Sequence, residues 1–174
     1  PFLESTEQVL QILAASFISN LNKNFNDKIS DHCSRIVEML AANSALPAGL
    51  NVSTAHQLFN NCYPIHPLTL LLLPALCQKV AQNERTLFTY LGSHEPHGFL
   101  DTLNRLEITD KELPWVMPWE VYEYFIFNQP GLTTDHATHR RWAEVVTALE
   151  RLGDAPIQEF YLLKTIGLLN IIGA

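Results

Sequence analysis

The sequence predicts an all-α fold, a multi-helix bundle of about eight helices, from three observations. Nearly every run of apolar residues follows the spacing of a helix face. Prolines and glycines separate these runs more often than they interrupt them. No pair of alternating segments joined by a tight turn favours a β-hairpin. A chain of 174 residues can bury one full core or the cores of two small helical subdomains.

Three helices are expected before residue 64. Ser5 and Gln8 fit a capping box, which predicts a helix start. Ser53 is expected to cap a short third helix that ends before Pro64. The apolar faces of the first two helices are predicted from Val9, Leu13, Phe17 and Leu21, and from Ile29, Cys33, Ile36, Val37 and Leu40.

Prolines indicate where helices begin or are interrupted in the middle of the chain. Pro67 suits the first position of a fourth helix, where its missing N–H costs nothing. Pro74 falls inside that helix and is expected to kink or divide it. His66, between two prolines, is expected to pack or to bond to backbone through a ring nitrogen. A fifth helix, capped by Asn83, is expected to bury Leu87, Phe88 and Leu91.

The C-terminal part is also predicted to be helical. After a short helix over residues 99–106, residues 107–117 are expected to form a loop in which residues 113–115 pack. The aromatic residues over 118–127 allow a strand, but Pro118 at the start and the spacing of the apolar residues after it favour a helix. Further helices are expected over residues 140–152 and after Pro156. We expect two helical subdomains: residues 1–106 as a lid-like bundle and residues 107–174 as a second subdomain.

The composition of the chain disfavours some classes of binding partner. A net charge of −7, with 11 scattered basic residues, argues against a nucleic-acid footprint over the whole chain. Three cysteines without paired spacing favour a reducing, cytoplasmic setting. The longest apolar stretch is too short to cross a membrane. The low charged fraction of 17% indicates apolar surface that a further partner or domain covers.

No catalytic or metal-binding set is predicted in this chain. It contains neither the phosphate-binding loop G-x-x-x-x-G-K-[ST] nor a dinucleotide or nucleophile-elbow motif. The pairs His94/His97 and His136/His139 have no third or fourth ligand nearby in sequence, so no metal site is expected. The cysteines lie in apolar runs, where thiols are usually inert. We therefore expect no catalysis and no cofactor in this chain itself.

Arg85 is the candidate binding residue. It lies in the first turn of the predicted fifth helix, directly after Asn83-Glu84. One interpretation is an ion pair with Glu84, Glu95 or another local carboxylate. The other is a phosphate contact, because the planar guanidinium meets phosphate oxygens with two hydrogen bonds and keeps its charge. With no phosphate loop in this chain, another domain would have to bring that phosphate.

The segment over residues 81–91 resembles the second sensor motif of AAA+ ATPases, broadly G-D-x-R-x-A-L. Arg85 falls on the arginine of the motif, Asn83 on its acidic residue and Leu87 near its apolar position. The motif's glycine is replaced by Gln82.

The wider sequence is similar to large bacterial P-loop ATP-binding proteins of the AAA+ or STAND-like kind, several of them linked to anti-phage defence. In these, a Tyr-Pro-x-His-Pro element (here residues 63–67) precedes the arginine element. A Glu-Pro-x-Gly-Phe element (here residues 95–99) follows it. The resemblance extends over most of the chain, to Asn170.

This resemblance implies a non-catalytic helical lid or regulatory fragment of an ATPase. Its core would bind ATP and Mg²⁺ and would be the main partner, the missing part of the same chain. Any nucleic-acid contact would be made only indirectly through that parent protein. Both ends of the chain are expected to be cut, and the last helix resembles the start of a truncated winged-helix-like unit. Arg85 would sense the γ-phosphate, and Asn83 would cap the helix that positions it.

Two other functions stay open. The chain can instead be a helical protein–protein interaction module without a nucleotide role, in which Arg85 is structural. A small enzyme that uses its histidines is the third alternative.

Overall fold

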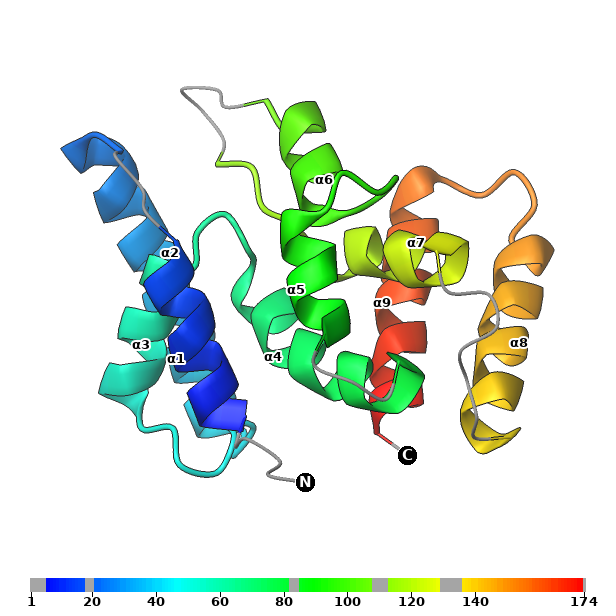
Figure 1. Cartoon of the computed structure of the whole chain (residues 1–174), viewed down its shortest axis with the longest axis horizontal. Coiled ribbons are helices and arrows are strands. Elements are labelled where there is room, and N and C mark those ends of the chain that lie inside the picture. Colours follow the sequence, from blue (N-terminus) through cyan, green and yellow to red (C-terminus); the bar gives the residue numbers. More distant parts are fainter. Residues whose placement is uncertain (1–5, 18–20, 82–84, 108–112, 129–135, 174) are drawn as a thin grey trace. The chain divides into compact units, whose positions relative to one another are not determined.

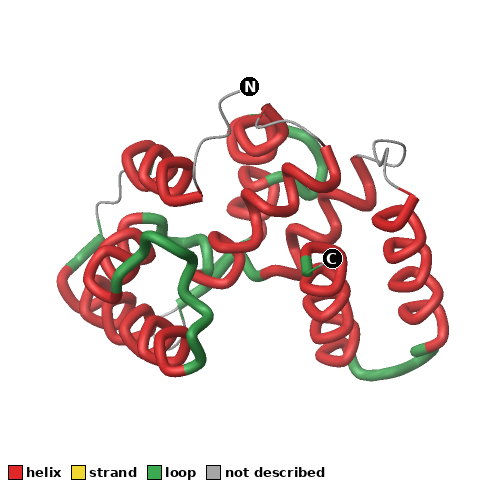
Figure 2. Tube along the Cα trace, turned by 90° about the horizontal axis from the view of Figure 1, so that it is seen from below, coloured by secondary structure: helices red, strands yellow, loops and turns green. Residues whose placement is uncertain are grey.

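The computed structural model describes residues 6–17, 21–81, 85–107, 113–128 and 136–173. Over these residues it confirms the all-α prediction, with nine α-helices, one π-helical turn and no β-strand (Figures 1 and 2). The chain divides into two compact units, each built from two pieces of the sequence. Unit 1 comprises Pro1–Leu70 and Leu106–Trp115, and unit 2 comprises Leu71–Arg105 and Val116–Ala174.

Unit 1 is a small helical bundle with an apolar centre. Helix α3 packs against both α1 and α2. Phe59 and Ala55 of α3 and Cys33 of α2 have no exposed surface. The helices of this unit are α1 (Thr6–Ser16), α2 (Lys23–Ala42) and α3 (Val52–Asn61), followed by the first turn of α4 (Pro67–Leu76).

Two asparagines set the helix starts in unit 1. The side chain of Asn22 accepts the N–H of Phe25 at 3.0 Å, and that of Asn51 accepts the N–H of Thr54 at 2.8 Å. Asparagine is among the strongest N-cap residues because its short side chain reaches these free N–H groups. The expectation that Ser53 caps α3 is therefore wrong. The capping box that begins at Ser5 lies outside the described residues.

The predicted apolar faces of the first two helices are found in part. Val9 and Leu13 are buried, but α1 ends at Ser16, before Phe17. In α2 the buried residues of the predicted face are Ile29, Cys33 and Val37.

The prolines of α4 act differently from one another. Pro67 begins the helix, as predicted. Pro74 lies inside α4 without ending it, and the chain continues into a π-helical turn, η1 (Cys77–Ala81). A π turn is a rare, wider turn in which the usual i→i−4 hydrogen bonding of an α-helix is interrupted.

Unit 2 contains the remaining helices: α5 (Arg85–Gly92), α6 (Phe99–Arg105), α7 (Pro118–Asn128), α8 (His136–Arg151) and α9 (Ile157–Ile172). Helix α9 packs against both α7 and α8. Trp119 of α7 stacks on Tyr161 of α9, with ring centroids 4.6 Å apart and planes 8° from parallel. The predicted helix start at Pro118 is confirmed, and α8 begins before the predicted residue 140.

The contact between α8 and α9 depends on a glycine. A Cβ atom added at Gly167 would lie 2.6 Å from Cγ1 and 2.8 Å from Cγ2 of Val145. Valine is β-branched and has little freedom to turn away. The close approach of these two helices therefore requires the absence of a side chain at residue 167.

The two units have other bounds than the predicted subdomains, residues 1–106 and 107–174, which stay a prediction. Unit 2 is interrupted after Arg105, close to the predicted boundary at residue 106. The chain then returns to unit 1 over Leu106–Trp115 before it enters unit 2 again. The winged-helix-like unit expected at the C-terminus stays a prediction. Among the described helices, none combines the length and the apolar character needed to span a bilayer.

Candidate functional site

The predicted sensor residue begins a helix. α5 starts at Arg85, so the backbone of this residue is in the first turn, as expected. Its side chain and all of Asn83 lie outside the described residues. α5 is anchored by Leu87 and Tyr90, which are 2% and 0% exposed. Phe88, predicted to lie on the inner face, is instead 52% exposed.

The Glu-Pro-x-Gly-Phe element forms the turn between α5 and α6. Glu95 Oε2 accepts a hydrogen bond from the hydroxyl of Tyr124 at 2.7 Å. His97 has a positive φ of 61°, and its N–H donates to Asp101 Oδ2 at 2.9 Å. A Cβ atom at Gly98 would lie 3.0 Å from the carbonyl oxygen of Glu95. Glu95 and His97, the polar residues of this element, therefore both make hydrogen bonds that hold the turn in place.

Charged side chains of unit 2 form local pairs. Arg105 lies 3.2 Å from Glu120 and 3.7 Å from Asp101, and Lys164 pairs with Glu123. Glu95, one of the carboxylates considered for Arg85, is held by Tyr124. Glu84, the other named candidate, lies outside the described residues.

His66 caps α4 through its side chain, as the sequence predicted. The N–H of Leu68 donates to His66 Nδ1 at 3.2 Å. His66 is only 5% exposed, so this bond is shielded from water. Because Nδ1 accepts this bond, a neutral His66 carries its proton on Nε2.

A second imidazole completes the contacts of His66. His32 of α2 places its Nε2 3.2 Å from Nε2 of His66. Trp115 stacks on His32 with ring centroids 4.7 Å apart and meets Tyr63 edge-on at 5.0 Å. We call His32, Tyr63, His66 and Trp115 the imidazole cluster; all four residues belong to unit 1.

The imidazole cluster was not predicted as a site. Only His66 and Trp115 were expected to make structural contacts. His32 was missed because it lies 34 residues from His66 and beside residues that were assigned to an apolar helix face. No local motif signals such a pair.

Burial favours the neutral form of both rings. It lowers the pKa of His66 to about 4, and the nearby His32 adds to this effect. Burial, and after it the charge of Arg35, lowers the pKa of His32. A metal ligand must offer a lone pair, but His66 Nδ1 accepts from Leu68 and His32 Nε2 accepts from His66. Nor do the described residues bring together three or more groups of the kinds that hold a metal ion.

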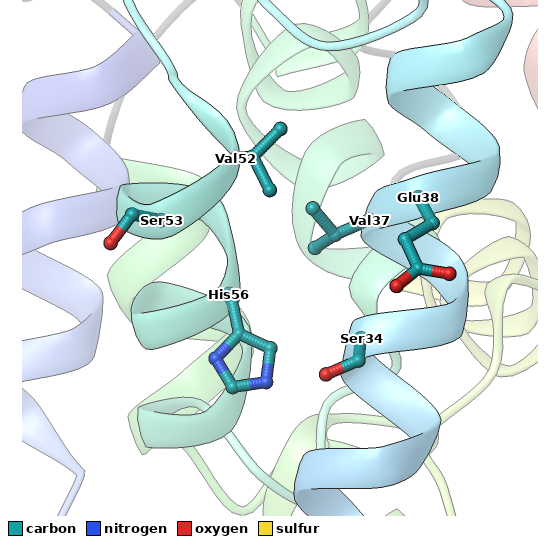
Figure 3. Close-up of a pocket in the computed structure, with 6 residues that line it drawn as sticks. All are labelled: Ser34, Val37, Glu38, Val52, Ser53 and His56. Atoms are coloured by element: carbon teal, nitrogen blue, oxygen red, sulfur yellow. The ribbon is translucent and has the colours of Figure 1, made fainter.

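A small pocket lies between α2 and α3 in unit 1 (Figure 3). Its volume is about 230 Å³, below the usual range for small-molecule sites. His56 and Ser34 point into the gap, whereas the hydroxyl of Ser53 points away from it. The lining residues are Ser34, Val37, Glu38, Val52, Ser53 and His56.

His56 is held in place by its neighbours. Its Nε2 lies 3.3 Å from both the hydroxyl and the carbonyl oxygen of Ser30. Asn60 Nδ2 lies 3.3 Å from His56 Nδ1. Because the Ser30 carbonyl can only accept, its contact assigns the hydrogen of a neutral His56 to Nε2 and leaves Nδ1 as the acceptor for Asn60.

The three cysteines are poor nucleophiles. Cys33, Cys62 and Cys77 are free and buried. Burial raises the pKa of each thiol to about 12. A thiol with so high a pKa holds almost no thiolate at neutral pH.

Comparison of this chain with protein-family models, with curated proteins and with solved structures finds no match.

Proposed function

We propose that the chain is a helical lid or regulatory module of a larger ATP-dependent protein, with Arg85 as the residue that contacts nucleotide phosphate. The module would not hydrolyse ATP itself. Its ATPase core would bring ATP and Mg²⁺ to Arg85. A cytoplasmic location fits this role.

The observation that carries the proposal is the position of Arg85 in its helix. α5 begins at this residue, and the buried Leu87 and Tyr90 hold the helix on the body of unit 2. The first turn of a helix also has free N–H groups, which favour a nearby anion. A guanidinium in this turn suits contact with a phosphate brought by another domain.

The test uses the longer protein to which we assign the chain. Arg85→Ala should lower its ATP turnover by tenfold or more, on the order of the loss of one charged transition-state contact. Arg151→Ala, an exposed arginine at the end of α8, is the matched control and should leave turnover unchanged. Equal turnover in wild type and Arg85→Ala would exclude the sensor role.

A second experiment tests the assignment to a non-catalytic module. The isolated 174-residue chain is incubated with Mg²⁺ and ATP, and phosphate release is measured. No release above buffer is expected. Turnover that follows the protein through purification would contradict the assignment.

The alternative function, a protein–protein interaction module, is favoured by one surface. Leu162, Ile166 and Leu169 lie on one side of α9 and are 61%, 50% and 51% exposed. Apolar side chains gathered on one helix face often mark a binding surface. If Leu162→Ser plus Leu169→Ser abolished a function of the parent protein that Arg85→Ala left intact, the interaction module would be preferred.

A further inference from the structure

The contact between His32 and His66 joins two parts of unit 1 that are distant in sequence. His32 lies in the middle of α2, and His66 is the residue before α4. Their Nε2 atoms are 3.2 Å apart, a distance at which one ring donates a hydrogen bond to the other. The two rings therefore connect α2 to the start of α4.

The hydrogen of this bond has a defined direction. The N–H of Leu68 can only donate, so His66 Nδ1 accepts and Nε2 of His66 carries the hydrogen. His66 Nε2–H then donates to Nε2 of His32, which must be an unprotonated acceptor. The proton of neutral His32 is consequently on its Nδ1.

Every available position for an additional proton conflicts with this arrangement. Protonation of His66 at Nδ1 places a second hydrogen between Nδ1 and the backbone nitrogen of Leu68, which already carries one. Protonation of His32 at Nε2 places two hydrogens between the two rings. In either case a hydrogen bond becomes a repulsion between donors.

Among the residues that the structure describes, the surroundings of the pair offer little compensation for a positive charge. On α2, Arg35 is cationic and donates to the backbone carbonyl of Asp31. Asp31 precedes His32 in the sequence and is exposed, so water screens its carboxylate. The connection between α3 and α4 contributes Tyr63, and the segment Leu106–Trp115 contributes the uncharged indole of Trp115. On α3, His56 bonds to Ser30. Neither ring of the pair forms a salt bridge with a described carboxylate.

We propose that the His32–His66 pair is an acid-released clasp, which holds α2 to the start of α4 while both rings are neutral and opens when either ring gains a proton. The consequence is a conformational response to pH that is confined to unit 1 and has no need of a ligand. It stands independently of the role proposed for Arg85.

The direction of the response follows from the lowered pKa values. In the unfolded chain a histidine takes up a proton near pH 6.5, whereas folded His66 has a pKa of about 4. The contribution of the pair to stability is therefore complete above pH 6.5 and is lost as the pH falls from about 6.5 towards about 4. At pH 5 the opening equilibrium should be shifted on the order of tenfold or more relative to pH 7.5.

Two measurements test the clasp. In the first, ¹⁵N NMR of the ring nitrogens of the wild-type chain at pH 7.5 should show His66 protonated at Nε2 and His32 at Nδ1. The opposite tautomers, or a measured pKa near 6.5 for His66, would overturn the proposal. This measurement needs no variant.

In the second, hydrogen-exchange protection factors are compared at pH 7.5 and pH 5, after correction for intrinsic exchange. Peptides from α2 and from residues 62–70 should lose tenfold or more protection, while peptides from α8 should change less. His32→Gln plus His66→Asn keeps a side-chain acceptor at each position, with asparagine a good N-cap, and should remove most of this loss. His94→Gln, at an exposed histidine of unit 2, should retain it. An equal loss in wild type and in the double variant would contradict the clasp.

Discussion

The polar contacts described for the two units differ in the groups that take part. In unit 1, the contacts described above join uncharged groups in the pair His32 and His66 and in the asparagine caps. Charged side chains take part there as well: Glu7 accepts a hydrogen bond from Gln11, and Arg35 donates to a backbone carbonyl. Unit 2 uses ionic partners, in which Arg105, Lys164 and the carboxylates of Glu120 and Glu123 take part. An added proton therefore places a new charge on the pair His32 and His66, whereas it removes a charge from the pairs made by Glu120 and Glu123 in unit 2. The same change of pH acts on two different kinds of interaction.

The largest expected effect concerns the apolar core on which unit 1 depends. Phe59→Ala removes a side chain with no exposed surface and should lower the free energy of unfolding by about 3–5 kcal/mol. Urea unfolding followed by circular dichroism measures this change in the free energy of unfolding. Gln57→Ala, at an exposed position of the same helix, should change stability by less than about 0.5 kcal/mol. If the two variants lost the same stability, unit 1 would not depend on its core in this way.

The next effect concerns the close contact of α8 and α9 in unit 2. Gly167→Ala places a methyl group against Val145 and should cost about 1–2 kcal/mol, after the better helix propensity of alanine offsets part of the strain. Thermal or urea unfolding measures this. At Gly92 a Cβ atom meets nothing within 4 Å, so Gly92→Ala is the control and should be neutral or slightly stabilising. A neutral Gly167→Ala would mean that the two helices have room to separate.

A smaller effect should follow from the hydrogen bond between α7 and the α5–α6 turn. Tyr124→Phe removes the donor to Glu95 and should lower stability by about 1 kcal/mol. Tyr161→Phe makes the same chemical change at a tyrosine whose described contact is ring stacking. It should therefore have little effect. Equal losses in the two variants would show that the bond to Glu95 contributes nothing measurable.

The smallest effect separates the units by their response to salt. Arg105 and Asp101 are 50% and 42% exposed, so their attraction is screened by ions. Raising NaCl from about 0.05 M to about 1 M should weaken unit 2 by less than about 1 kcal/mol relative to unit 1. Hydrogen exchange of peptides from α6 and α3 measures the difference. A larger loss in unit 1 would reverse the comparison between the units.

The fold could be predicted from the sequence where the signal is local. Helix periodicity gave the helical class, and Pro67 and Pro118 marked helix starts that the structure confirms. The cap of α3 was misassigned because Ser53 and Asn51 are both good caps, and only backbone geometry chooses between them. The exposure of Phe88 was missed because Tyr90 takes the buried position beside Leu87.

The candidate site was predictable only in part, for a physical reason. His66 could be expected to cap a helix because the prolines on both sides of it are visible in the sequence. Its contact with His32 depends on how α2 packs, and no pattern of neighbouring residues specifies that contact. The roles of Arg85 and Asn83 stay predictions that the experiments above address.

The return of Leu106–Trp115 to unit 1 has a consequence for the order in which the chain is made. During synthesis, residues 1–70 leave the ribosome well before Trp115, which stacks on His32. Unit 1 therefore cannot assemble its full set of contacts until Trp115 has been translated. A truncated chain that ends at Leu70 would contain the three complete helices of unit 1, α1, α2 and α3. It would lack Trp115, whose indole stacks on His32.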